Sequence, residues 1–277
     1  MEVSLISFAK EMTALTRLIF IFAIVSSLFL GDESFAKKKK AEEKTTLPPP
    51  ATSEIKMGIE EGSTADFLKW IRSQEATFHT KQIFFFDTPD LGLFAKGILF
   101  RVRRGEDQTF DSVVKWRRKE AEPFSKPNAK TLRAISCEWD VVSEKEKWLS
   151  CALSHQSKKI LKSIESESVG EFLESNQKKL AKSLGEQMNF SDIKSLGRIN
   201  SSEWEFSVGE WVSTCSLWEL PGQARALECS VRVPVEKESE ARQSLQKKLS
   251  EAGLRIKADG QLKTEWFLHK LTEKSAR

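Results

Sequence analysis

The sequence contains no tyrosine among its 277 residues and only three histidines, His79, His155 and His269. The histidines are scattered without the spacing of a metal site, and we interpret them as surface or helix-face residues. Gly-x-Ser-x-Gly, His-Glu-x-x-His, Cys-x-x-Cys and glycine-rich phosphate-loop motifs are also absent. The usual sequence signatures of serine hydrolases, zinc proteases, thiol redox proteins and P-loop enzymes are therefore missing.

A hydrophobic run long enough to cross a membrane is also missing. The apolar run from Leu18 to Leu30 has thirteen residues, whereas a spanning helix needs about 20. Two basic residues precede this run and Ser34-Phe35-Ala36 follows it, which is typical of a secretory signal peptide. We therefore predict a signal peptide at 1–36 and an exported protein, periplasmic or secreted. An uncleaved N-terminal membrane anchor is the alternative.

Low-complexity sequence follows the predicted cleavage site. Residues 37–53 contain four consecutive lysines and three consecutive prolines with almost nothing to bury, which predicts a flexible leader. Cleavage would remove two basic and four acidic residues, so the net charge would rise from +4 to +6. That excess favours anionic partners but is too small for a nucleic-acid-binding protein. Residues 54–277 are enough for one domain with a single core.

Cysteine is scarce, but its four copies suit an exported chain with two disulfides. Cys215 and Cys229 are equidistant from Gly222, so a hairpin about Pro221-Gly222 would set them directly opposite each other. The same register would pair Leu217 with Leu227 and Glu219 with Arg225. Buried, reduced thiols are the alternative. No comparable argument connects Cys137 with Cys151.

The remaining pattern predicts an α+β protein with a mostly antiparallel sheet of eight strands. Strands are expected at 54–59, around 84–87, around 98–103 and at 112–118, 133–142, 203–212, 213–220 and 227–233, with helices near 64–71, over most of 144–188, after Pro234 and at 262–271. Pro234 suits a helix start because a proline costs no hydrogen bond in the first turn.

Charged side chains recur at every second position of these strands, with apolar or aromatic residues between them. Alternate residues of a strand point to opposite faces, so each strand has one charged and one apolar face. A one-sided sheet exposed to water gives the same alternation. If instead the sheet closes into a tunnel-like barrel with helices packed outside, the charged faces line a polar interior. Tryptophans on apolar faces then belong to the core rather than to a base-stacking surface.

The most informative segment is residues 84–103, FFFDTPDLGLFAKGILFRVR. Arg101 and Arg103 share one face, and two neighbouring guanidiniums suit the oxygens of a phosphate. The order of aromatic strand, Asp-Thr-Pro-Asp turn and Gly-Ile-x-x-Arg-x-Arg strand resembles the CYTH family, also called triphosphate tunnel metalloenzymes. Asp87 and Asp90 are residues that hold turns or cap helices, and we favour that role over a catalytic one.

The resemblance implies a set of phosphate-binding cations and metal-binding carboxylates. The family's opening Glu-x-Glu-x-Lys strand matches Thr52-Ser-Glu54-Ile-Lys56, and its closing Glu-x-Glu strand matches Glu228-Cys-Ser230. Thr52 and Ser230 thus stand where the family has carboxylates. The resemblance implies phosphate contacts at Lys56, Arg101, Arg103, Lys115, Arg198 and Lys263. It implies catalytic metal ligands at Glu54 and Glu228, and Glu138, Asp140 and Glu205 are the alternatives for a supporting ligand.

These residues lead to an expectation and its alternatives. The resemblance implies binding of a triphosphate or inorganic polyphosphate in a basic tunnel and, if the chain is an enzyme, hydrolysis of a phosphoanhydride with Mg²⁺ or Mn²⁺. All the expected cations have counterparts while two carboxylates do not, so anion binding is better supported than hydrolysis. A non-catalytic polyanion-binding protein and a structural envelope protein are the alternatives.

Overall fold

The computed structural model describes residues 49–119, 133–158, 164, 169–184, 188–220, 225–258 and 262–275. The predicted signal peptide at 1–36 and most of the predicted leader at 37–53 lie outside the described residues. Within those residues, no helix has the length and apolar character needed to cross a bilayer. The first strand begins at Thr52, two residues ahead of the expected position.

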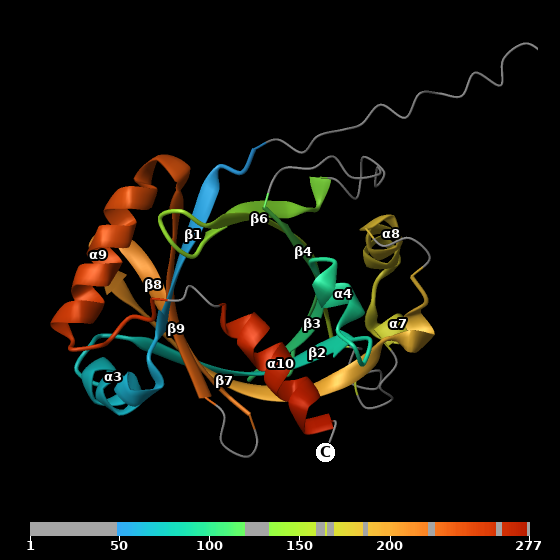
Figure 1. The fold of residues 1–277 in the computed structure, drawn as a ribbon, viewed down its shortest axis with the longest axis horizontal. Coiled ribbons are helices and arrows are strands. Elements are labelled where there is room, and N and C mark those ends of the chain that lie inside the picture. Colours follow the sequence, from blue (N-terminus) through green and yellow to red (C-terminus); the bar gives the residue numbers. More distant parts are fainter. Residues whose placement is uncertain are drawn as a thin grey trace, which may run out of the picture. The chain divides into compact units, whose positions relative to one another are not determined.

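Nine strands form one closed barrel in the described part of the chain (Figure 1). They are β1 (Thr52–Ile59), β2 (Thr77–Asp87), β3 (Ile98–Gly105), β4 (Phe110–Arg118), β5 (Ser136–Val141), β6 (Lys147–Ser157), β7 (Lys194–Val208), β8 (Trp211–Glu219) and β9 (Arg225–Pro234). Their order is β1-β5-β6-β4-β3-β2-β7-β8-β9, and β9 pairs with β1 to close the barrel. The predicted closed barrel is confirmed. Its sheet is mixed, because β1 and β5 are parallel while the other neighbouring strands named here are antiparallel.

The predicted number of eight strands is wrong because β6 was assigned to a helix. The region 144–188 forms β6, followed by α7 (Val169–Phe172) and α8 (Ser175–Leu184). Leu149, Cys151 and Leu153 of β6 are buried at alternate positions, as expected for a strand. The residues between them are serine and alanine, which give little polar contrast. Because of this weak contrast, the alternation typical of a strand was not recognised in the sequence.

The boundary between β7 and β8 also differs from the prediction. Strands were expected at 203–212 and 213–220, but β7 runs to Val208 and β8 starts at Trp211. Gly209 has a φ of 60°, a left-handed conformation that glycine adopts without strain. The hairpin therefore turns at Gly209, and β7 is a long strand of 15 residues.

Helices cover the outside of the barrel, as predicted, and they form two groups. On one flank, α3 (Thr64–Ile71) and α9 (Glu238–Glu251) pack on the outer faces of β1, β8 and β9. On the other flank, α7 and α8 cover β3, β4 and β6. Ala241, Leu245 and Leu249 of α9 are fully buried, which confirms the predicted amphipathic helix. Pro234 does not open it, because Pro234 is the last residue of β9 and α9 begins at Glu238.

One end of the barrel is covered by α10 (Lys263–Ser275), which confirms the helix expected at 262–271. Figure 1 shows α10 lying across the opening of the barrel. Phe267, Leu268 and Leu271 pack against inward-facing side chains such as Phe85 and Trp218. The short helix α4 (Gly92–Ala95) lies beside this end. These apolar contacts of α10 fill part of the barrel interior at this end.

Two disulfides join neighbouring strands of the barrel. Cys215 pairs with Cys229 across β8 and β9. The predicted register is confirmed, since Leu217 lies opposite Leu227 and Glu219 opposite Arg225. Cys137 of β5 is bonded to Cys151 of β6, a pair that could not be found without recognising β6 as a strand.

Candidate functional site

The inner face of the barrel surrounds a charged cavity of ≈ 330 Å³. Its charged lining residues are Lys56, Lys81, Arg101, Arg103, Lys115, Arg117, Arg232 and Lys263, together with Glu54, Glu138, Glu203, Glu205 and Glu228. The outward faces of the same strands pack against helices, as Val102, Val114 and Trp116 do. The charged alternation therefore marks an interior, and the alternative of a one-sided open sheet is wrong.

Arg101 and Arg103 lie side by side on the inner face of β3. Both line the cavity, and their Nε atoms are buried without a hydrogen-bond partner. Arg103 Nε lies 3.4 Å from Asp111 Oδ2. Burial, and then the positive charge of Arg103, lower the pKa of Arg101 to about 9. The guanidinium is still charged at neutral pH, so an anion placed beside it would relieve both effects.

A buried network of ion pairs joins β1, β4 and β5 near these arginines. Lys56 Nζ lies 3.0 Å from Glu54 Oε2 and 2.6 Å from Asp140 Oδ1. Arg117 Nε and Lys115 Nζ lie 2.7 Å and 3.4 Å from Asp140 Oδ2. Asp140 is fully buried and thus carries three cations on one carboxylate. A buried charge is tolerated only with such compensation.

The pKa values in this network follow from burial and from the neighbouring charges. Burial acts to raise the pKa of Glu54, but the positive charges of Lys56, Lys115 and Arg232 together outweigh it, and the pKa falls to about 2. Burial acts to lower the pKa of Lys56, but Glu54 and Asp140 raise it above its usual value. Burial, and then the charges of Arg117 and Lys56, lower the pKa of Lys115 to about 7. Lys115 is therefore the lysine of this network that is partly deprotonated at neutral pH.

Three carboxylates form a cluster with suitable chemistry for a divalent cation. Oxygens of Glu54, Glu138 and Asp140 lie within 4.8 Å of one another, and hard carboxylate oxygens are the ligands that Mg²⁺ and Mn²⁺ prefer. Arg232 also contacts the cluster, with its Nε 2.7 Å from Glu138 Oε2. The donor set fits a metal, although an ion would have to replace some of these contacts with cations.

Glu228 does not belong to that carboxylate cluster, although Glu54 and Glu228 were the predicted metal pair. Glu54 lies opposite Arg232 in the β1–β9 register, and Glu228 is four residues further along β9, roughly 13 Å at strand spacing. Ser230, where the family resemblance implies a carboxylate, lines the cavity and its hydroxyl donates to Glu54 Oε1 at 3.3 Å. Thr52 lies outside the cavity lining, at the start of β1.

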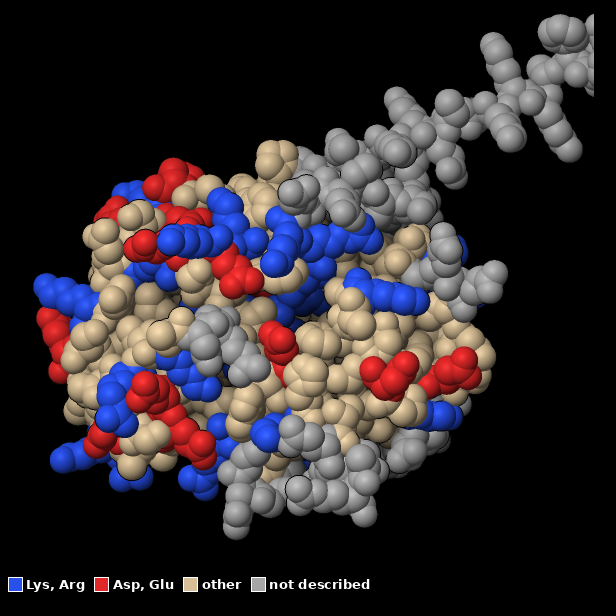
Figure 2. Space-filling view, in the orientation of Figure 1, with Lys and Arg blue, Asp and Glu red and all other residues tan. Residues whose placement is uncertain are grey.

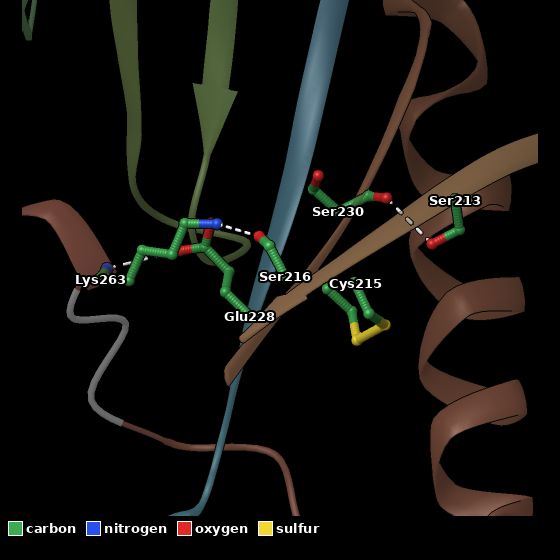
Figure 3. The surroundings of a disulfide bond; sticks show 7 residues. Ser213, Cys215, Ser216, Glu228, Ser230 and Lys263 are labelled. Atoms are coloured by element: carbon green, nitrogen blue, oxygen red, sulfur yellow. Dashed lines mark hydrogen bonds and ion pairs between the residues drawn. A yellow bond between two sulfur atoms is a disulfide. The ribbon is translucent and has the colours of Figure 1, made fainter. Parts of the chain in front are cut away.

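Glu228 instead binds Lys263 at the start of α10 (Figure 3). Lys263 Nζ lies 3.3 Å from Glu228 Oε1 and donates a hydrogen bond to Ser216 Oγ. The same ammonium lies 4.7 Å from the centroid of the Trp218 indole. Lys263 therefore reaches the cavity, as predicted, and also anchors α10 to β8 and β9.

Arg198 is the predicted phosphate ligand that the fold places elsewhere. It is exposed on β7 and is not among the residues that line the cavity. Glu203 on the same strand faces inward. Five positions separate Arg198 from Glu203, and an odd separation puts two residues on opposite faces of a continuous strand. The predicted grouping of Arg198 with the inward-facing charges ignored this parity.

Some lining residues escaped the sequence prediction. Lys81 of β2 lines the cavity and its Nζ lies 2.5 Å from Glu203 Oε2. Its spacing of two and four residues from Ile83 and Phe85, which also face inward, was the signal that could have identified it. Trp218 also faces inward, and its Nε1 is buried without a partner.

The Asp-Thr-Pro-Asp turn after β2 has the structural role that we favoured. Asp87 is buried, and its carboxylate accepts hydrogen bonds from the backbone N–H groups of Thr88, Leu93 and Phe94 at 2.7–2.9 Å. Burial outweighs these bonds and raises the pKa of Asp87. Neither Asp87, Asp90 nor any histidine is among the described residues that line the cavity.

Comparison with solved structures identifies the fold. A Hippeastrum protein, described as a candidate adenylyl cyclase with a dominant triphosphatase activity, superposes with a TM-score of 0.54 at 14% identity over 78% of this chain and 95% of that one. A candidate adenylate cyclase from Bacillus halodurans gives 0.54 at 15% identity over 78% and 98%. No protein-family model or curated protein sequence matches the chain. The chain has the CYTH triphosphate tunnel fold, which confirms the resemblance at the level of fold.

Proposed function

We propose that the barrel binds a triphosphate or an inorganic polyphosphate. The observation that carries this proposal is Arg101, whose buried Nε has no hydrogen-bond partner among the described residues. A buried N–H donor without a partner is costly, and phosphate oxygens match the geometry of a guanidinium. The cavity also contains eight cations against five glutamates. With Asp140, which pairs with three of the cations, the balance still favours an anion.

Titration of tripolyphosphate into the purified protein tests this binding. We expect Arg101→Gln to weaken the affinity roughly 10- to 100-fold, since a hydrogen bond to a charged group contributes about 1.5–3 kcal/mol. Arg225→Gln is the matched control, because Arg225 is exposed and pairs with Glu219 outside the cavity. Absence of tripolyphosphate binding in the wild-type protein would contradict the proposal and favour a structural role.

Hydrolysis of the bound anion is the second function, and the cluster of Glu54, Glu138 and Asp140 favours it. A divalent cation bound there would neutralise charge and polarise a phosphoryl oxygen. Arg101, Arg103 and Lys115 would hold the phosphate chain in place. Positioning and charge neutralisation account for most of the catalysis in phosphoryl transfer.

Phosphate release from tripolyphosphate with Mg²⁺ or Mn²⁺ tests the second function. We expect Glu138→Gln to abolish release and Glu205→Gln to retain it, because Glu205 lines the cavity outside the carboxylate cluster. Tight binding without any release, at every metal concentration, would leave the chain as a polyanion-binding protein that does not hydrolyse its ligand.

Export is part of the proposal. All four cysteines form disulfides, and disulfides persist in oxidising compartments. Nucleoside triphosphates are scarce outside the cytoplasm, which favours inorganic polyphosphate as the ligand. Mass spectrometry of the mature protein from cells that express the full chain tests this. We expect cleavage after Ala36, and an intact N-terminus would instead support the membrane-anchor alternative.

A further inference from the structure

A second cavity adjoins the barrel cavity at the end that α10 covers. Its volume is ≈ 760 Å³, against ≈ 330 Å³ for the barrel cavity. The two cavities share Lys115, Arg117, Leu262 and Thr264, so they meet along β4 and the start of α10. We call the second cavity the vestibule. Figure 2 shows Lys and Arg side chains gathered around a hollow above α10.

The vestibule is basic, like the barrel cavity. Its charged lining residues are Lys96, Lys115, Arg117, Arg118 and Lys119, with Glu146 and Glu265 as the acidic ones. Five cations therefore face two carboxylates, or three when Asp140, the partner of Lys115 and Arg117, is included. Glu146 also accepts a hydrogen bond from Trp148 Nε1 at 3.2 Å. The vestibule thus has an excess of positive charge that attracts anions.

The cations of β4 and of the residue that follows it lie in order from one cavity into the other. Lys115 and Arg117 share the inner face of β4, and Lys119 follows directly after the strand ends at Arg118. Lys115 and Arg117 line both cavities and Lys119 lines the vestibule. At strand spacing, the row from Lys115 to Lys119 extends over roughly 13 Å.

The same row continues inside the barrel through the arginines of β3. Arg101 and Arg103 lie opposite Val113 and Asp111 of β4. Arg103 lies opposite Asp111, and Asp111 is eight residues before Lys119. The distance from Arg103 to Lys119 along the strand direction is therefore roughly 26 Å. A triphosphate, with only three phosphorus atoms, covers a fraction of that length. The far end of the row therefore lies beyond the reach of a triphosphate held by Arg101.

We propose that the vestibule holds the part of an inorganic polyphosphate chain that extends beyond the phosphates bound inside the barrel. The protein would then prefer chains longer than three phosphates. Lys96 and Lys119 are the exposed cations of this extension, and Lys119 Nζ lies 5.0 Å from the centroid of the Trp148 indole. The inference rests on the proposed polyphosphate function and adds to it a preference for chain length.

Titrations of tripolyphosphate and of a long-chain polyphosphate into the full chain test the inference. We expect the double variant Lys96→Gln/Lys119→Gln to weaken the affinity for the long chain about tenfold, or about 1.4 kcal/mol. Its affinity for tripolyphosphate should change less than twofold. The ratio of variant to wild-type dissociation constants removes the statistical advantage of a long chain, which contains many triphosphate segments.

A charge-matched control is Lys179→Gln/Lys247→Gln, which removes two exposed lysines from α8 and α9. It should leave both affinities unchanged within twofold. Equal loss of affinity for both ligands in the vestibule variant, or no loss for either, overturns the inference while the barrel proposal stands. If the wild-type protein binds neither ligand, both proposals fail together.

Discussion

Lys56 Nζ lies 2.6 Å from Asp140 Oδ1 and connects β1 to β5, the one parallel pair among the nine strands. That pair shares only three residues of register on each strand. Asp140 also pairs with Arg117 of β4, so a single buried carboxylate holds three strands of the barrel wall. The same ion pair contributes to the fold and determines the charge inside the cavity.

Asp140→Asn should therefore destabilise the protein strongly. Removing one partner of a buried ion pair costs about 3–5 kcal/mol, and this change leaves Lys56, Lys115 and Arg117 without their shared carboxylate. Urea unfolding gives the free energy. Glu240→Gln, which breaks the exposed pair with Lys237, should change it by less than about 1 kcal/mol. A comparable loss in both variants would contradict the role assigned to Asp140.

Stability should decline as the pH falls from about 4.5 towards 2. Burial acts to raise the pKa of Glu54, but Lys56, Lys115 and Arg232 together lower it from 4.5 to about 2, and the pKa of Asp140 is also lowered. A carboxylate with a lowered pKa in the folded state adds stability above its unfolded pKa and loses it as the pH falls through its folded pKa. Urea midpoints between pH 7 and 2.5, with chelator present, measure this.

Glu54→Gln should flatten the acid part of that pH profile, because its amide cannot be protonated in this range. Glu251→Gln removes an exposed carboxylate of α9 and should reproduce the wild-type slope. Parallel profiles for all three proteins would show that Glu54 is not held ionised by Lys56.

Removing either disulfide should cost about the same free energy. Each bond joins cysteines that are 14 residues apart, and closing a loop of about 15 residues stabilises a fold by about 3 kcal/mol in the chain-entropy account. Cys137→Ser/Cys151→Ser and Cys215→Ser/Cys229→Ser should each lower the unfolding free energy by about that amount under oxidising conditions. An unchanged value for one double variant would mean that its bond does not form in solution.

The strand faces could be predicted from the sequence because alternation is a local property. Glu54 and Lys56, or Arg101 and Arg103, identify the inner face from two residues of one strand. The register of Cys215 and Cys229 could also be predicted, since a Pro-Gly turn lies midway between them. These predictions needed no knowledge of any distant segment.

The second disulfide could not be predicted in this way, and Glu138 and Asp140 were expected only as supporting ligands of the pair Glu54 and Glu228. Glu54 meets Glu138 and Asp140 through the parallel pairing of β1 and β5, and no hairpin fixes such a register. Cys137 and Cys151 are neighbours only because β6 is a strand. The family resemblance supplied Glu228 as a metal ligand, whereas the geometry ties it to Lys263.

Arg198 and Arg103 offer a direct test of the strand parity that separates them. Arg198 is exposed on the outer side of β7, and Arg103 lines the cavity with a buried Nε that lacks a hydrogen bond. Both Arg198→Gln and Arg103→Gln remove one positive charge.

We expect Arg198→Gln to change the tripolyphosphate affinity less than twofold, and Arg103→Gln to weaken it about tenfold, equivalent to about 1.4 kcal/mol. Calorimetric titration at two salt concentrations measures both, since screening suppresses distant charge effects more than contacts. An equal loss in the two variants would show that total charge, rather than the inner face of the barrel, determines how the protein binds its anion.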